Sequence, residues 1–111
     1  MNGGVIINPL SESTYLILLA LHQGPLHGYG VIKAIEKASE GNYIIAPGTL
    51  YGVVKNIQKQ GLIETIEVQT EQRKKKTYRI TDRGKEVLRS EYSRYLKMIE
   101  LTKKIVTERE E

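Results

Sequence analysis

The sequence predicts a mainly α-helical protein with a small β-hairpin. Three short segments before residue 61 carry apolar residues at helical spacing. Two runs rich in β-branched residues follow, at residues 63–68 and 77–80, and a polar, basic segment separates them. One further helical pattern then runs from residue 82 to about residue 108. Three helices followed by a hairpin are the order of a winged helix-turn-helix, here with a long C-terminal helix added.

The first helix begins after Ser11 or Ser13, either of which is a plausible N-cap. The run from Thr14 to Leu21 is apolar on nearly every side. Such a helix is buried in a core or in a subunit interface. The Gly24–Pro25 pair ends it.

The second and third helices are both amphipathic. The second starts near His27–Gly30, has one apolar stripe (Val31, Ile32, Ile35, Ala38) and closes at Gly41–Asn42. Pro47 suits the first position of the third helix, and Gly61 is its C-terminal cap candidate. The third helix is predicted to bury Leu50, Val53, Val54 and Ile57 and to expose Thr49, Tyr51, Gly52, Lys55, Asn56 and Lys59.

The hairpin and the last helix complete the predicted fold. The strand register stays open, because Ile63 and Ile66 fall on opposite faces. Thr81 is the predicted N-cap of the last helix. Apolar or amphipathic residues then recur at alternating steps of four and three, which is a heptad-like seam: Leu88, Tyr92, Tyr95, Ile99, Thr102 and Val106. A neighbouring row of Val87, Met98, Leu101 and Ile105 widens this seam.

The basic character of the chain is concentrated in the predicted wing. Residues 73–79 hold five cations and no acid, so the rest of the chain has 12 cations against 13 acids. A run of like charges is often only a solvated loop. Between two strands and after a compact helical segment, it favours a loop that faces phosphates.

Several classes of function are disfavoured. The chain has no cysteine, which excludes disulfides, thiol catalysis and cysteine-based zinc sites. His22 and His27 have no carboxylate at ligand spacing, so no metal and no cofactor is expected. Catalytic motifs are absent and the carboxylates occupy surface-like positions, so we predict that the protein is not an enzyme. The longest apolar run has seven residues and no signal peptide is evident, which favours a cytoplasmic protein without a membrane span.

The polar face of the third helix predicts contact with double-stranded DNA. No acid occurs between Glu40 and Glu64, as a surface that meets a polyanion requires. The helix fits a major groove about 12 Å wide, and the hairpin reaches the adjacent backbone. Tyr29 and Tyr51 also have a packing interpretation, in the core and against the wing respectively. The predicted DNA contacts are Tyr29, Thr49, Tyr51, Lys55, Asn56, Lys59, Arg73, Lys74, Lys75 and Lys76.

Four ordered fragments resemble the PadR family of winged-helix transcriptional regulators. They are His27–Gly30, Pro47–Tyr51, Gln60–Ile63 and Lys76–Gly84, within a match over about residues 10–107. The resemblance implies a homodimer, an operator with two half-sites and usually repression. It also divides the chain into an N-terminal arm (1–9), a winged helix-turn-helix DNA-binding domain (10–81) and a C-terminal dimerisation helix (82–111). The single last helix is similar to that of the short subfamily, which includes drug-sensing repressors.

Two sets of residues follow from this resemblance. The predicted dimer interface comprises Leu16, Leu88, Tyr95, Met98, Ile99, Thr102 and Val106. Some drug-sensing members stack a flat ligand on a tryptophan of the last helix; this chain has no tryptophan, and Tyr95 occupies that place. The candidate site for a small aromatic effector is Tyr92, Tyr95 and Met98, and the alternative is that these side chains simply pack in the dimer interface. Two alternatives remain at this point: a winged-helix module that binds protein, and a small-molecule-binding protein with residual DNA affinity.

Overall fold

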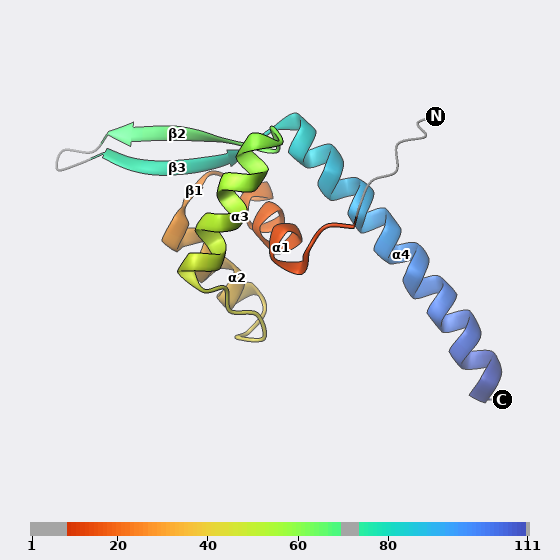
Figure 1. Ribbon diagram of the computed structural model, residues 1–111. Coiled ribbons are helices and arrows are strands. Elements are labelled where there is room, and N and C mark those ends of the chain that lie inside the picture. The colour runs from red at the N-terminus through yellow and green to blue at the C-terminus, as the bar shows by residue number, and fades with distance from the viewer. Residues whose placement is uncertain (1–8, 70–73, 111) are drawn as a thin grey trace.

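The computed structural model describes residues 9–69 and 74–110 and has the predicted mixture of helices and a small sheet (Figure 1). The elements in chain order are α1 (Glu12–His22), β1 (Leu26–His27), α2 (Gly28–Ala38), α3 (Pro47–Lys59), β2 (Ile63–Gln69), β3 (Lys74–Ile80) and α4 (Asp82–Glu110). The hairpin of β2 and β3 and the long helix α4 project from opposite sides of the helical core. The molecule is therefore elongated, with extents of 64 × 36 × 22 Å.

Helix α1 lies at the centre of the core. Ile17 and Leu18 are completely buried, and Leu21 is nearly so. Around them pack Val31 of α2, Leu50 and Ile57 of α3, Ile63 and Tyr78 of the sheet, and Leu88 of α4. The prediction that α1 is buried on most sides is confirmed, except that Leu19 remains exposed.

Local hydrogen bonds set where the helices begin. The Ser11 hydroxyl accepts a hydrogen bond from the backbone N–H of Thr14 at 3.1 Å, which selects Ser11 over Ser13 as the N-cap of α1. The Thr81 hydroxyl accepts from the backbone N–H of Gly84 at 3.1 Å and caps α4. It also donates to the carbonyl of Gly61 at 2.6 Å, so the start of α4 is tied to the end of α3.

The sheet has three strands in the order β1-β3-β2, not the two that the sequence predicts. Leu26 pairs with Tyr78, and His27 pairs with Thr77. Strand β1 was missed because two residues are too short to show any alternation. All pairs are antiparallel, so β3 links the two segments that flank it in space.

The hairpin strands are longer than predicted. Strand β3 begins at Lys74 rather than Thr77, so Lys74, Lys75 and Lys76 lie in a strand and not in a turn. A lysine run has low strand propensity, and pairing with β2 overrides that preference here. The register is now defined: Ile63 pairs with Ile80 and is buried, whereas Ile66 lies on the other face and is half-buried. Arg73 lies outside the described residues.

No helix in the described ranges 9–69 and 74–110 is long and apolar enough to cross a membrane.

Gly84 allows α4 to approach the sheet closely. A Cβ placed on Gly84 would overlap the carbonyl oxygen of Leu62 and lie 2.7 Å from Cγ1 of Ile80. Both are fixed parts of the core rather than flexible side-chain ends. Gly52, in the middle of α3, has no atom within 4 Å of the same position. The two glycines therefore offer a matched pair of substitutions.

We predict opposite effects of alanine at these glycines. Gly84→Ala should lower the free energy of unfolding by about 2 kcal/mol or more, because backbone and core must move to accept the methyl group. Gly52→Ala should raise it by about 0.5–1 kcal/mol, because alanine stabilises an exposed helix interior relative to glycine. Urea denaturation followed by circular dichroism measures both. Equal stability of the two variants would contradict the close approach at Gly84.

Candidate nucleic-acid interface

Helix α3 divides its residues between the core and the solvent as predicted. Leu50, Val54 and Ile57 are buried. Val53, predicted to be buried, is only partly so. The opposite face is exposed and has no acid: Thr49, Tyr51, Lys55, Asn56 and Lys59. Amide, hydroxyl and ammonium groups on one helix face are the donors that recognise base edges and phosphates.

Tyr51 joins α3 to the first turn of α2. A Cβ placed on Gly28 would lie only 2.6 Å from the Tyr51 hydroxyl, so the ring rests directly against that glycine. Burial raises the pKa of the neighbouring Tyr78, and the proximity of Tyr51 raises it further. Tyr51 nevertheless remains 51% exposed. It therefore packs beside the sheet and also presents surface to solvent.

Tyr29 stands on the surface at the start of α2. It is 62% exposed, so the interpretation that it packs in the core is wrong. The Lys33 ammonium lies 5.7 Å from the centre of the Tyr29 ring, a cation–π contact that sequence reasoning missed. Lys33 also approaches the Glu36 carboxylate at 3.9 Å. The start of α2 has no acid in its first turn, so the positive end of the helix dipole is left uncompensated there.

The wing is less basic than its sequence indicates, because β2 places acids opposite the cations of β3. Arg79 donates two hydrogen bonds to Oε2 of Glu64, from Nη2 at 2.8 Å and from Nε at 3.0 Å. Glu67 occupies the register position opposite Lys76. A window counted along one strand cannot include the partner strand. Lys76 is exposed, and the backbone of Lys74 and Lys75 continues β3 toward the tip of the hairpin.

A side-chain contact links α3 to the wing. The amide of Gln58 on α3 donates a hydrogen bond to the hydroxyl of Thr65 on β2. This bond connects α3 directly to the hairpin, so the exposed face of the helix is positioned relative to the wing.

Helix α4 has two parts with different surroundings. Leu88 belongs to the core of the domain, so it offers little surface to a partner. Leu16 packs against that core and is only partly exposed. From Leu96 to Thr107 every residue is exposed. The exposed set includes Met98, Ile99, Thr102 and Val106, which were predicted to form an interface, together with Leu96, Leu101 and Ile105.

In the described part of the single chain, the three predicted effector residues have different surroundings. The Tyr95 ring packs edge-on against Tyr15, with 4.8 Å between ring centres. The Met98 sulfur lies 3.7 Å from a guanidinium nitrogen of Arg94. Of the three, Tyr92 is the one that lines the groove of about 430 Å³ between α1 and α4. Tyr15 and Leu19 of α1 line the same groove.

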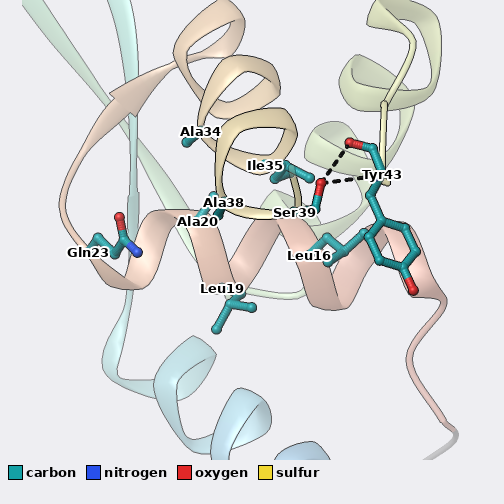
Figure 2. A pocket seen from close by; sticks show the side chains of 9 residues that line it. All are labelled: Leu16, Leu19, Ala20, Gln23, Ala34, Ile35, Ala38, Ser39 and Tyr43. Carbon is teal, nitrogen blue, oxygen red and sulfur yellow. Dashed lines mark hydrogen bonds between the residues drawn. The ribbon is translucent and has the colours of Figure 1, made fainter. Parts of the chain in front are cut away.

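A second apolar groove of about 220 Å³ lies between α1 and α2 (Figure 2). Leu16 and Ala20 contribute from α1, and Ala34 and Ile35 contribute from α2. The Ser39 hydroxyl accepts a hydrogen bond from the backbone N–H of Tyr43 at 3.0 Å and holds that tyrosine at one end of the groove. None of the predicted effector residues lies here. Within residues 9–69 and 74–110, no cluster of histidines and carboxylates could hold a metal ion.

Comparison with known proteins identifies the family. Residues 17–90 match the family described as "Transcriptional regulator PadR-like family". The chain belongs to the PadR-like family. Its members are transcriptional regulators and not enzymes. The predicted family and the predicted winged-helix fold are thereby confirmed.

Individual relatives span different shares of the chain. The transcriptional regulator YqjI of Escherichia coli K12 is 36% identical over 89 residues, which cover 80% of this chain and 41% of that protein. A transcriptional regulator from Clostridium thermocellum is similar in structure, with a TM-score of 0.71, 28% identity and coverage of 86% of this chain and 89% of that one. Bacillus subtilis PadR, solved in complex with operator DNA, has a TM-score of 0.66 at 26% identity, over 75% of this chain and 46% of that one. The chain spans less than half the length of the curated relatives it matches.

The contact between Gly28 and Tyr51 gives a test of how the PadR-like recognition face is held. Gly28→Ala should displace the Tyr51 ring, because the new methyl group would occupy the place of its hydroxyl. We expect weaker DNA binding from this substitution in the wild-type background and no further loss in a Tyr51→Ala background. The coupling energy should be about 1 kcal/mol, as for other residues in contact. Fluorescence anisotropy of labelled DNA with all four proteins measures it, and additive losses would contradict the prediction.

Proposed function

We propose that this protein is a homodimeric repressor that binds a pseudo-palindromic operator in double-stranded DNA. One observation carries the proposal: α3 presents an exposed polar face without acids, next to a wing whose β3 strand carries the exposed Lys76. Membership of a family of transcriptional regulators, and a relative of similar structure bound to operator DNA, support the same conclusion.

The proposed DNA contacts divide into two groups. Lys55 and Asn56 lie beyond the first turn of α3 and read base edges, lysine by donation to guanine and asparagine by pairing with adenine. Thr49, Tyr51, Lys59 and Tyr29 contact the sugar–phosphate backbone around them. Arg73, Lys74, Lys75 and Lys76 of the wing contact phosphates without reading sequence.

Dimerisation uses the free half of α4. Six large apolar side chains are exposed there in the single chain: Leu96, Met98, Ile99, Leu101, Ile105 and Val106. Each of them still has 43–58% of its surface exposed, and covering this apolar surface with a second copy favours association. Two copies related by a two-fold axis would present two α3 helices to half-sites about one turn of DNA, roughly 34 Å, apart.

A small aromatic effector is proposed only at Tyr92. Its groove between α1 and α4 also has Lys85 and Arg89 at its edge, which suits a planar compound with an acidic group. Such a compound would alter DNA affinity by binding two dimer geometries unequally. The packing of Tyr95 against Tyr15 argues against the stacking role that the resemblance assigns to Tyr95.

The first prediction on function separates base readout from phosphate contact. Asn56→Ala and Lys55→Ala should each reduce the preference for operator over random DNA by about 1–3 kcal/mol. Lys76→Ala is the matched control: it should weaken both DNAs equally and lower the salt slope by about one. Titrations at several salt concentrations, with an operator selected by the wild-type protein, measure both. Wild-type binding that does not depend on salt would instead favour a protein-binding module.

The second prediction concerns the dimer. Met98→Asp should raise the dissociation constant of the dimer about tenfold or more, because it places a charge among apolar side chains. Ser93→Asp, with the same new charge on the opposite side of the helix, should leave association unchanged. Analytical ultracentrifugation distinguishes them, and equal behaviour would locate the interface elsewhere. A shortened chain should keep α4 through Tyr95, since Leu88 and Glu91 are part of the domain itself.

A further inference from the structure

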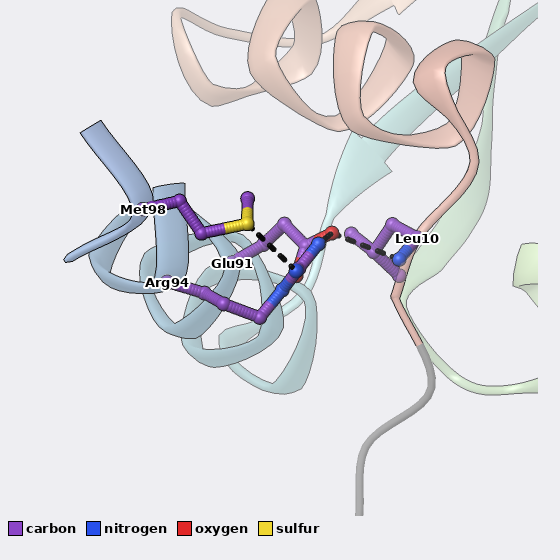
Figure 3. A network of polar contacts seen from close by, with 4 residues as sticks. All are labelled: Leu10, Glu91, Arg94 and Met98. Carbon is purple, nitrogen blue, oxygen red and sulfur yellow. Dashed lines mark hydrogen bonds and ion pairs between the residues drawn. The ribbon is translucent and has the colours of Figure 1, made fainter. Parts of the chain in front are cut away.

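Glu91 is a buried carboxylate on α4, although the sequence placed the carboxylates on the surface. Only 4% of it is exposed. Its side chain accepts hydrogen bonds from Leu10 and Arg94 (Figure 3). Oε2 accepts from the backbone N–H of Leu10 at 2.9 Å and from Nη2 of Arg94 at 3.0 Å, and Oε1 accepts from Nε of Arg94 at 2.9 Å. The partner residue Leu10 lies 81 positions away in the sequence, which is why sequence reasoning missed this site.

Glu91 stays ionised in this environment. The hydrogen bonds from Arg94 lower the pKa of the carboxyl group below its usual value, although burial alone would raise it. Removing a carboxylate from water is unfavourable, and an ion pair with one buried member seldom stabilises a fold more than apolar residues of the same shape would. The ion pair with Arg94 lies within α4 and holds the Glu91 carboxylate in place, so the hydrogen bond that this carboxylate accepts from Leu10 has a fixed direction.

The network ties α4 to α1 at two places. Leu10 directly precedes Ser11, the N-cap of α1, so its bond to Glu91 holds the start of that helix. The Arg94 guanidinium lies 5.3 Å from the centre of the Tyr95 ring, and that ring packs on Tyr15 one turn further along α1. Within residues 9–69 and 74–110, Glu91 and Tyr95 thus contact the start of α1, whereas every residue from Leu96 to Thr107 is exposed.

Beyond this turn, α4 acts as a lever. The 17 residues from Glu91 to Thr107 are separated by 16 steps of about 1.5 Å, so this part of the helix spans about 24 Å. A change of about 10° at the network would move the far end by about 4 Å, which exceeds the roughly 3.4 Å rise of one base pair. In a dimer built on α4, the same change would move the two α3 helices relative to each other.

We propose that Glu91 is a positioning residue that sets the angle between α4 and the DNA-binding domain, and thereby selects the half-site spacing that the dimer accepts. Glu91 does not touch DNA in this proposal; it acts through Leu10, Arg94 and the helix it orients. The inference rests on the proposed dimeric binding of two half-sites. A purely structural role would change stability and affinity for every DNA together, whereas a role in orientation changes the choice among spacings.

The test uses the full-length protein and three sets of DNA: the selected operator, the same operator with one base pair added or removed between half-sites, and a single half-site. Glu91→Gln removes the charge and weakens the fork with Arg94 at nearly constant volume. Glu86→Gln, the same change at an exposed position on the same helix, is the control. For Glu91→Gln we expect the preference for the native spacing to fall about fivefold or more. Affinity for the single half-site should stay within about twofold, as after a neutral surface change. Glu86→Gln should match the wild type in both.

Three results would overturn the inference. Glu91→Gln could keep the full spacing preference of the wild type, or it could lose half-site affinity in parallel with operator affinity. A wild-type protein that ignores spacing would overturn the proposed two-half-site binding and this inference with it, so the two failures are distinguishable. Should Glu91→Gln not fold, Arg94→Gln provides the same test, because the Arg94 side chain is 38% exposed and its loss leaves the bond from Leu10 in place.

Discussion

The burial of α1 is the constraint on which the rest of the structure depends. This one helix contacts α2, α3, β3 and α4, and Ile17 and Leu18 within it have no exposed surface. Each functional surface is therefore placed by a face of α1: the polar side of α3 lies outward because its apolar side meets Leu18 and its neighbours in the core. Leu19 of α1 stays exposed on the side that faces α4 and lines the groove between these two helices (Figure 2).

The positions of the acidic residues are as informative about the proposed DNA-binding surface as the positions of the cations. Glu64 and Glu67 are on β2, where they face Arg79 and the position of Lys76 across the hairpin. Helix α3 has none. Cross-strand pairs of opposite charge stabilise an isolated two-stranded ribbon. The wing thus has opposite charges facing each other across its strands, and these hold the strands together. Its lysines lie further along β3 toward the tip. This arrangement suits a two-stranded ribbon that extends away from the core.

The order of the four helices and the hairpin, the cap at Thr81 and the proline start of α3 could all be predicted, because each depends on residues close together in the chain. The features that were missed depend on distant partners. Lys74–Lys76 were expected in a turn, since nothing local favours a strand there, and pairing with β2 decides otherwise. The burial of Glu91 requires Leu10. For Tyr29 the sequence left both a DNA contact and core packing open, and its exposure excludes core packing.

The heptad-like pattern of α4 explains why sequence alone could not separate its two tasks. Leu88 and Ile99 belong to the same row, but the first packs inside the domain and the second is exposed. Periodicity reports that a helix face is apolar and says nothing about whether the surface that covers it belongs to the same chain. The change occurs at Glu91–Tyr95, where polar bonds replace apolar contact. A network that orients α4 is most effective at that boundary, because the helix turn there sets the direction of the remaining, exposed part of α4.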